Sequence, residues 1–323
     1  MKGSMFAIID WRRVILVALA ATVALSAVPA IVGPYALYVL TLALYYTILA
    51  ASWNLLAGMT GQFSLAHQSF AAIGAYTSGL LSVRYHLPLW ITMPCGVLMS
   101  AALGYSLGRM VLRMRAIYLA IATWAFAETI HILLAAAYSI TRGELGLSVP
   151  SLYGNVDPLP YYYTFVALAV ISLFAMYLLV RSPLGYFMRA IKDDELRAET
   201  LGVDTTGIKV LVFTLTSGFA GLAGVFYAHY IKVLSPQIAD FSEMAKLIIM
   251  VVVGGLGSFI GPIVGAAPIH VMLTYLQKYG EWDMVFFALI VIVLMRSYMG
   301  GLAALGAEIY HKLRGARLGP EAS

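Results

Sequence analysis

Long runs without charged residues dominate this chain and limit what it can fold into. A helix needs about 20 predominantly apolar residues to cross the hydrocarbon core of a bilayer. Candidate runs occur at 14–32, 35–57, 65–83, 89–108, 117–138, 161–180, 210–228, 247–276 and 283–299. A chain with this pattern buries its apolar surface in lipid as helices, so the sequence predicts an all-α, polytopic integral membrane protein.

The composition agrees with a membrane protein and argues against several other classes. Hydrophobic residues make up 62% and charged residues 11% of the 323 residues, against ~45–50% and ~25% in a soluble domain. Cys95 is the sole cysteine, which excludes an intrachain disulfide framework and a multi-cysteine metal site. No metal-binding histidine spacing, P-loop or Ser-centred nucleophile motif occurs. We therefore expect no metal, cofactor, nucleic acid partner or enzymatic activity, and any energy from ATP must come from another chain.

The run 247–276 is too long for one crossing. Its middle is rich in residues that bend helices or allow close packing, namely Gly254, Gly255, Gly257, Gly261, Pro262 and Gly265. We predict two short helices joined by a bend, which serves either helix packing alone or motion during gating. Small residues recur at the same four-residue spacing in Gly104 with Gly108 and in Ser217 with Gly221. With the hairpin counted as two, the chain has about ten membrane segments.

Lysine and arginine residues are unevenly distributed between the loops on the two sides, and such residues are enriched in cytoplasmic loops. If both termini are cytoplasmic, most of the basic residues fall inside. The outer side then holds Arg84, Arg142, Lys232, Lys246 and Lys278. We therefore predict an inner-membrane protein with cytoplasmic N- and C-termini.

The two ends of the chain carry separate predictions. The first run follows a basic start and has small residues from Ser26 to Ala30, a pattern also typical of a cleaved signal peptide. We favour an uncleaved helix because the apolar run continues to a spanning length. Residues 1–299 would form the membrane domain, and residues 300–323 an amphipathic basic tail on the inner surface.

The longest inside loop, residues 181–209, is highly charged. Pro183 and Gly185 break the preceding helix, residues 186–201 are rich in helix formers, and Gly202 stands where a C-terminal cap belongs. Anionic lipid would repel the acidic residues of this amphipathic segment. We therefore predict that a protein partner covers it.

This loop, with the run 189–202 (RAIKDDELRAETLG), resembles the coupling loop of LivM-type permeases of branched-chain amino acid ABC importers. Residues 53–67 (WNLLAGMTGQFSLAH), 219–224 (FAGLAG) and 252–266 (VVGGLGSFIGPIVGA) are similar to further motifs of that family. In the family this loop docks on a cytosolic ATPase. The resemblance therefore implies coupling contacts at Gly185, Arg189, Ala190, Asp194, Glu195, Glu199 and Gly202. Ala66, Gln68 and Arg142 depart from the family pattern, which bears on solute choice more than on class.

Polar residues also occur at membrane depth. Asn54, Gln62, Ser64 and His67 lie among glycines between two apolar runs, and such residues are tolerated when buried in protein or lining a wet cavity. Glu128 lies in the middle of a run, with His131 one turn along on the same face. Because a charge there is costly, we expect both to face the translocation path or the bundle interior.

The resemblance implies a permease subunit that forms half of the pathway of an ABC importer for branched-chain or related hydrophobic amino acids. The implied partners are two cytosolic ATP-binding subunits, a second homologous permease, an extracytoplasmic solute-binding protein and membrane lipid. The same class of importer could instead carry urea, short amides or aromatic acids. A different alternative is an ion-coupled secondary transporter with Glu128 and His131 as a proton relay.

Overall fold

The computed structural model describes residues 22–114, 116–154, 157–276, 280, 285, 289, 292, 301 and 302. Part of the first predicted segment, most of the last one and almost all of the predicted tail 300–323 lie outside these residues. The side of the two termini and the total of ten segments therefore stay predictions.

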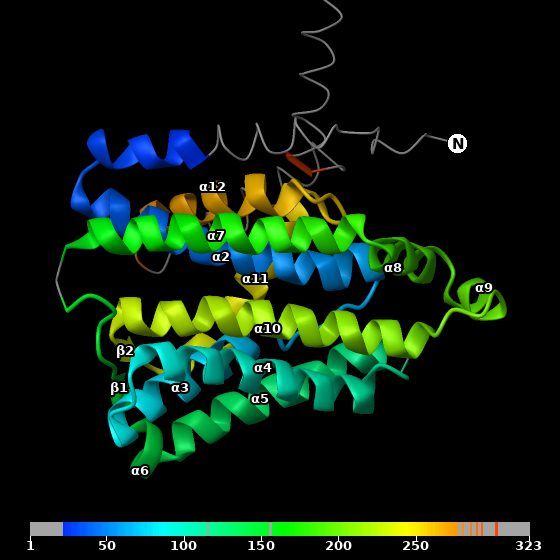
Figure 1. Ribbon diagram of the computed structural model, residues 1–323, viewed down its shortest axis with the longest axis horizontal. Coiled ribbons are helices and arrows are strands. Elements are labelled where there is room, and N and C mark those ends of the chain that lie inside the picture. The colour runs from blue at the N-terminus through cyan, green and yellow to red at the C-terminus, as the bar shows by residue number, and fades with distance from the viewer. Residues whose placement is uncertain are drawn as a thin grey trace, which may run out of the picture.

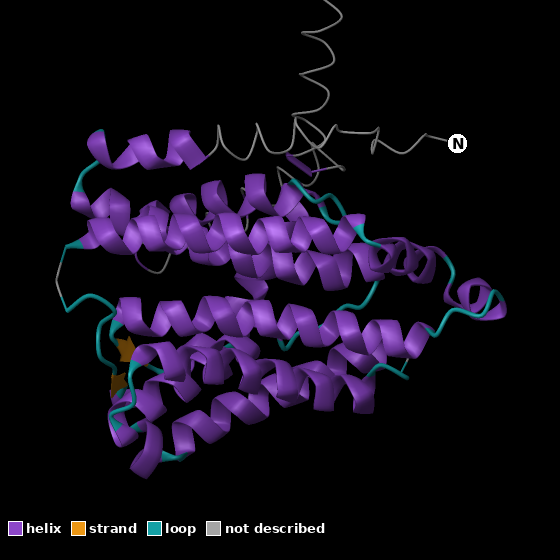
Figure 2. Ribbon diagram, in the orientation of Figure 1, coloured by secondary structure: helices purple, strands orange, loops and turns teal. Residues whose placement is uncertain are grey.

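The described part of the chain is mostly helical (Figure 2). Its elements are η1 (Val28–Ala30), α2 (Pro34–Thr60), α3 (His67–Tyr85), α4 (Leu89–Val111), α5 (Ala116–Ala136), α6 (Tyr138–Thr141), η2 (Gly143–Leu145), β1 (Leu147–Ser148), α7 (Pro158–Arg181), α8 (Pro183–Asp193), α9 (Glu195–Thr200), α10 (Thr205–Ile231), β2 (Val233–Leu234), η3 (Pro236–Ala239), α11 (Phe241–Gly255) and α12 (Gly261–Leu276). Within the described residues, 5 helices are long and apolar enough to cross a membrane: α2, α4, α5 from Ile117, α7 and α10. The expectation of a helical membrane protein is confirmed at this level.

The long helices lie side by side in two layers (Figure 1). The helices α2, α7 and α12 form one layer, and α10 with α3, α4 and α5 forms the other. The two layers meet where α10 packs against α2, and α11 fills the space between them. The helices α8 and α9 project from one end, called the α8 end, and the antiparallel pair β1–β2 closes the opposite end, called the β end.

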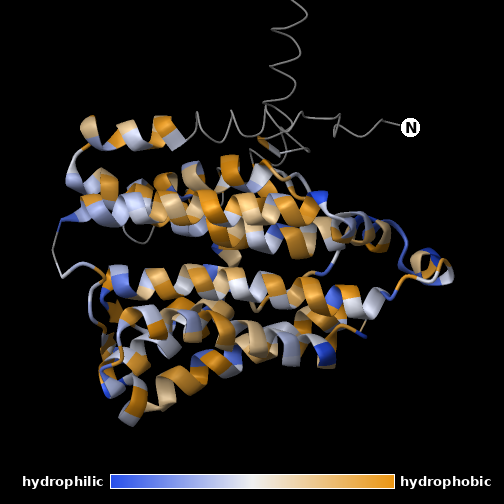
Figure 3. Cartoon of the chain, viewed as in Figure 1, coloured by the Kyte–Doolittle hydropathy of each residue, from blue (hydrophilic) through white to orange (hydrophobic). Residues whose placement is uncertain are grey.

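The distribution of hydrophobic and hydrophilic residues matches this arrangement of the helices. Apolar residues predominate along the helices, and hydrophilic residues gather toward the two ends and on the α8–α9 segment (Figure 3). The largest fully buried side chains include Trp53, Tyr45, Tyr162, Phe70 and Phe213. Aromatic residues thus supply much of the contact between α2, α3, α7 and α10 inside the bundle.

Small residues let α3, α4 and α10 approach closely. A Cβ atom on Gly74 would lie 2.5 Å from the carbonyl oxygen of Gly221, and one on Gly104 would lie 2.5 Å from the Cβ of Ser217. Neither distance leaves room for a methyl group. The small residues singled out at Gly104, Ser217 and Gly221 therefore allow backbone contact between helices.

Residues 61–66 return into the bundle before α3 starts. The indole Nε1 of Trp53, two turns inside α2, donates to the carbonyl oxygen of Ser64 at 2.8 Å. The backbone N–H of Leu65 donates to the hydroxyl of Thr123 on α5 at 3.0 Å. Irregular backbone at membrane depth needs such protein partners, because lipid offers none. The helix α3 therefore begins inside the bundle and runs toward the β end.

The run 247–276 forms two helices, α11 and α12, that pack against each other and are joined by residues 256–260. The helix α11 begins at Phe241, before the run that the sequence indicates. Lys246 therefore lies within a helix of the bundle, and its assignment to an outer loop is wrong. The apolar run began at 247 because Glu243 and Lys246 interrupt the hydropathy without interrupting the helix.

Candidate functional site

The bend between α11 and α12 is held by one side chain of α2. The side-chain amide of Asn54 donates to the carbonyl oxygen of Ser258 at 2.9 Å, and its Oδ1 accepts from the backbone N–H of Gly257 at 2.8 Å. Asn54 is 1% exposed. Gly257 has a φ of +82°, a conformation that a residue with a side chain rarely adopts. Asn54, which was predicted to lie in the interior, is thus buried and acts as a clamp on the glycine-rich bend by binding its backbone.

The helix α8 reaches the same place. The ammonium group of Lys192 donates to the carbonyl oxygen of Gly58 at 2.6 Å. A Cβ atom on Gly257 would lie 3.0 Å from that oxygen and 3.1 Å from the Lys192 nitrogen. We call the contact of Asn54, Gly58, Lys192 and Gly257 the glycine junction. It joins α2, α8 and the α11–α12 bend, and a Cβ atom on Gly58 would lie only 2.6 Å from the backbone nitrogen of Gly257, so backbone meets backbone at its centre.

The other glycines of the bend pack α11 against α12. A Cβ atom on Gly265 would lie 2.6 Å from the Cα of Gly254, and one on Gly261 would lie 3.0 Å from the carbonyl carbon of Gly255. Pro262, at the start of α12, is buried beside them. These positions therefore serve close packing, and whether the bend moves stays a prediction.

The predicted coupling residues lie along α8, α9 and the turn that follows. Asp194 caps α9 by accepting from the N–H of Arg197 at 3.1 Å and forms a salt bridge with its side chain at 2.8 Å. Glu195 pairs with Lys209 of α10, and Glu199 accepts a hydrogen bond from Thr205 at 2.6 Å. The structure thus ties these acidic residues to α9 and α10.

The remaining predicted positions differ in exposure. Gly185 is buried, and a Cβ atom there would overlap the carbonyl group of Val180. The Arg189 guanidinium lies 5.0 Å from the ring centre of Tyr186, Ala190 is exposed, and Gly202 has a φ of +86° at the turn after α9. Large apolar side chains around them are also exposed, namely Tyr186, Phe187, Leu196 and Leu201.

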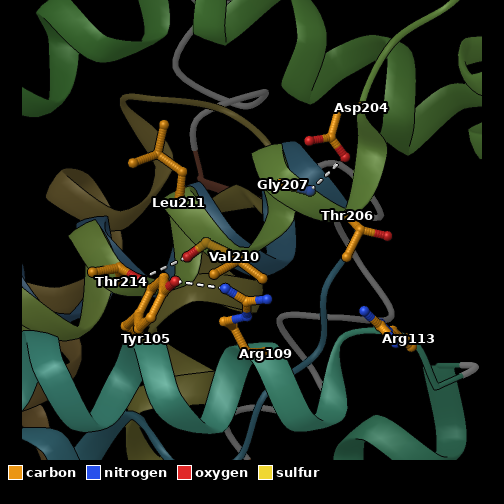
Figure 4. Close-up of a pocket in the computed structure, with 9 residues that line it drawn as sticks. All are labelled: Tyr105, Arg109, Arg113, Asp204, Thr206, Gly207, Val210, Leu211 and Thr214. Carbon is orange, nitrogen blue, oxygen red and sulfur yellow. Dashed lines mark hydrogen bonds between the residues drawn. The ribbon is translucent and has the colours of Figure 1, made fainter.

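A groove with Arg109 and Arg113 on one wall opens between the last turns of α4 and the first turns of α10 at the α8 end (Figure 4). Its cavity volume is about 580 Å³. The guanidinium of Arg109 donates to the hydroxyl of Tyr105 at 2.9 Å, and Arg113 extends from the turn that follows α4. Across the groove, Asp204 accepts from the N–H of Gly207 at 2.9 Å and caps α10.

The predicted polar residues around the start of α3 are all buried. His67 shares a hydrogen bond of 2.7 Å between its Nε2 and the hydroxyl of Ser52. The Ser64 hydroxyl accepts from the N–H of Ala66 at 3.3 Å. Gln62 is 4% exposed, and its side-chain amide has no hydrogen-bond partner among the described residues. It lines a cavity of about 380 Å³ that also reaches Glu195 and Lys209.

Glu128 and His131 are separate from these groups. Both lie on α5, an outer helix of the bundle, and both are half-buried. Within the described residues no hydrogen bond or ion pair joins Glu128 to His131 or to another side chain. Their assignment to the translocation path stays a prediction.

A polar cavity in the β-end half of the bundle was not predicted from the sequence. It has a volume of about 150 Å³ and is lined by Tyr45, Tyr46, Gln68, Tyr227, Val233, Ser235, Gln237, Ile238 and Glu243. We call it the polar chamber. Glu243, in the first turn of α11, accepts from the Tyr46 hydroxyl at 2.6 Å and from Lys246 at 2.7 Å. One feature of the sequence could have indicated this cavity. Glu243 and Lys246, an acid and a base one helical turn apart, directly precede the apolar run 247–276.

Comparison with known proteins identifies the family. The family model described as the permease component of a branched-chain amino acid transport system matches residues 35–295. The chain is 34% identical over 283 residues to the high-affinity branched-chain amino acid transport system permease protein LivM of Salmonella typhimurium, covering 79% of this chain and 67% of that protein.

Two further relatives agree with that match. LivM of Escherichia coli strain K12 is 33% identical over 310 residues, covering 87% of this chain and 73% of that protein. The permease protein LivH of Salmonella typhimurium is 25% identical over 282 residues, covering 79% and 90%. No solved structure matches the chain. The chain belongs to the family of permease components of branched-chain amino acid transport systems.

Proposed function

We propose that this chain is a permease subunit of an ABC importer and forms half of the pathway for branched-chain or related hydrophobic amino acids. The observation that carries the proposal is the family match over residues 35–295, with LivM relatives at 33% and 34% identity. A second, LivH-like permease would supply the other half. Two ATP-binding subunits and an extracytoplasmic solute-binding protein would complete the importer.

The α8 end is the cytosolic end in this proposal. The basic residues near that end of the described helices are Arg109, Arg113, Arg181, Arg189, Lys192, Arg197 and Lys209. The β end has Arg84, Arg142 and Lys232. An excess of basic residues is characteristic of cytoplasmic loops, so the distribution supports this orientation.

The segment α8–α9 receives the ATP-binding subunits. Its exposed apolar side chains, Tyr186, Phe187, Leu196 and Leu201, stand among charged residues, which favours a protein partner over water. Force applied there reaches the bundle through the glycine junction, because Lys192 contacts Gly58 directly and Gly58 lies against the bend at Gly257. Closure of the ATP-binding subunits would thus displace α11 and α12 relative to α2.

Reconstitution in proteoliposomes tests the function. The expected result is leucine uptake only when both permeases, the ATP-binding subunits and the binding protein are present. Uptake by this polypeptide alone, driven by a pH gradient, would support the secondary transporter with Glu128 and His131 instead. Uptake of urea, a short amide or an aromatic acid without leucine competition would replace the proposed solute class.

A pair of variants tests the docking assignment. Glu199→Lys should uncouple ATP hydrolysis from uptake while membrane insertion is retained. Thr205→Val is the matched control, because it removes the hydrogen bond that Glu199 accepts within the chain and leaves the carboxylate in place. Equal losses of coupling in the two variants would assign Glu199 to internal structure and contradict docking.

A further inference from the structure

The polar chamber combines an acid at membrane depth with access for a ligand. Tyr45 and Tyr46 belong to the middle of α2, so Glu243 lies well inside the bundle. Its side chain is 23% exposed and that of Lys246 is 26% exposed, so the pair is not sealed from the cavity. Ionisable residues inside a membrane protein are costly to bury and commonly mark the path of a solute or ion.

The first turn of α3 borders the chamber as well. Gln68, which lines it, is the second residue of α3. No side chain caps the start of α3 at Ala66, and the Tyr45 hydroxyl donates to Oε1 of Gln68 at 3.5 Å. The free N–H groups of a helix start favour an anionic group. The chamber is thus bordered by Glu243 on α11 and, through Gln68, by the uncapped first turn of α3.

Aromatic rings and aliphatic side chains complete the walls. The ring centres of Tyr45 and Tyr227 are 4.7 Å apart, and Val233 and Ile238 add apolar surface. Ring faces attract cations. The volume of about 150 Å³ is below the ~300–1,000 Å³ of a drug-sized pocket, so it suits the head of a small solute.

We propose that the polar chamber is an intramembrane binding site for the head of a zwitterionic amino acid, with the ammonium group at Glu243 and the carboxylate at the first turn of α3. The inference rests on the proposed function for its solute class, and it adds a place where solute is held during transport. Lys246 competes with the solute for Glu243. Opening of the Glu243–Lys246 pair would accompany solute entry.

Thermal stabilisation of the purified permease in detergent tests binding directly. The probes are leucine, isoamylamine, which has only the ammonium group, and isovalerate, which has only the carboxylate. Leucine and isoamylamine should raise the melting temperature, and Glu243→Gln should weaken binding of both roughly tenfold or more, because a charge-assisted hydrogen bond is lost. Absence of stabilisation of the wild-type protein by leucine and isoamylamine would overturn the proposal.

Lys246→Gln separates binding from a structural role of the ion pair. Both Glu243→Gln and Lys246→Gln break the pair, so a purely structural role predicts the same change in isoamylamine binding. The proposal predicts opposite changes, since Lys246→Gln frees Glu243 for the ligand amine and should tighten its binding. Similar weakening in both variants would contradict the proposal.

Transport measurements then distinguish the chamber from the importer as a whole. In the reconstituted importer, Glu243→Gln should lower leucine uptake roughly tenfold, while ATP hydrolysis stimulated by loaded binding protein persists. Unchanged uptake in this variant would overturn the proposed binding site in the polar chamber but would not contradict the proposed importer. Failure of the wild-type complex to move leucine would overturn the proposed function. Thermal stabilisation of the isolated permease would still show whether the polar chamber binds the ligand.

Discussion

The side-chain amide of Asn54 satisfies two backbone groups that belong to a chain segment more than two hundred residues away. These groups are the N–H of Gly257 and the carbonyl of Ser258, at the point where α11 ends and no helix can pair them. Because lipid provides no substitute partner, a polar side chain buried in α2 is the means by which the bend is stabilised at this depth.

Asn54→Ala should lower stability by about 1–3 kcal/mol for each backbone group left unpaired. The measurement is the unfolding midpoint of the purified protein in detergent. Ser106→Ala is the control, since among the described residues this exposed hydroxyl bonds only to the carbonyl of Ala102 in its own helix. Midpoints that are equal in the two variants would show that the clamp at Gly257 contributes nothing to stability.

At the scale of elements, two kinds of contact hold the bundle and its projecting segment. The helices α3, α4 and α10 touch through backbone atoms at small residues, whereas α9 is tied to α10 by the Glu195–Lys209 pair. The first kind of contact requires that the contacting residues have little or no side chain, and the second requires two opposite charges. Substitutions of different types therefore test them.

Gly74→Ala should destabilise the protein by about 1–3 kcal/mol, as overpacking of a close contact does. The new methyl group would lie 2.5 Å from the Gly221 carbonyl oxygen. Gly218→Ala is a matched control on α10, because its Cβ would meet the Cβ of Ala101 at an ordinary 3.6 Å. Denaturant unfolding of both variants measures the difference, and a loss as large in Gly218→Ala would refute close packing as the cause.

Charge exchange tests the tie between α9 and α10. Glu195→Lys or Lys209→Glu alone should reduce coupled uptake, because each places two like charges together. The double variant restores opposite charges and should recover uptake if the pair acts within this chain. Persistent loss in the double variant, measured in the reconstituted complex, would instead assign Glu195 to contact with an ATP-binding subunit.

The elements and the site differ in how far the sequence predicts them. Apolar runs indicated α2, α4, α5, α7 and α10 because a spanning helix is a local property of about 20 residues. The polar chamber could not be predicted, since Glu243 meets Tyr46 across 197 positions. Asn54 could be placed in the interior by its polarity, but its contact with Gly257 depends on the tertiary fold.

At the scale of the whole molecule, the ends of the bundle differ in character. The α8 end has the charged α8–α9 segment and the groove of Arg109 and Arg113 (Figure 4), whereas the β end is closed by the short β1–β2 pair. The polar chamber lies nearer the β end and the glycine junction nearer the α8 end, with α11 running between them. Solute delivery and energy input would thus act at opposite ends of one helix.

Single-cysteine labelling measures this orientation. In a Cys95→Ser background, a cysteine at Arg197 should react with a membrane-impermeant maleimide only after cells are opened. A cysteine at Glu144, an exposed position near the β end, should react in intact cells. Labelling of position 197 from outside would place α8 and α9 away from any cytosolic subunit and overturn the coupling role.

The return of residues 61–66 into the bundle has a consequence for biogenesis. Among the described residues, α3 is not one of the helices that are apolar enough to span by themselves. The segment ahead of it donates a hydrogen bond, from the backbone N–H of Leu65, to the hydroxyl of Thr123 on α5. A nascent chain that stops before α5 would lack that partner. Stable insertion of α3 should therefore wait for sequence synthesised later, which makes early truncations substrates for membrane proteases rather than partly assembled bundles.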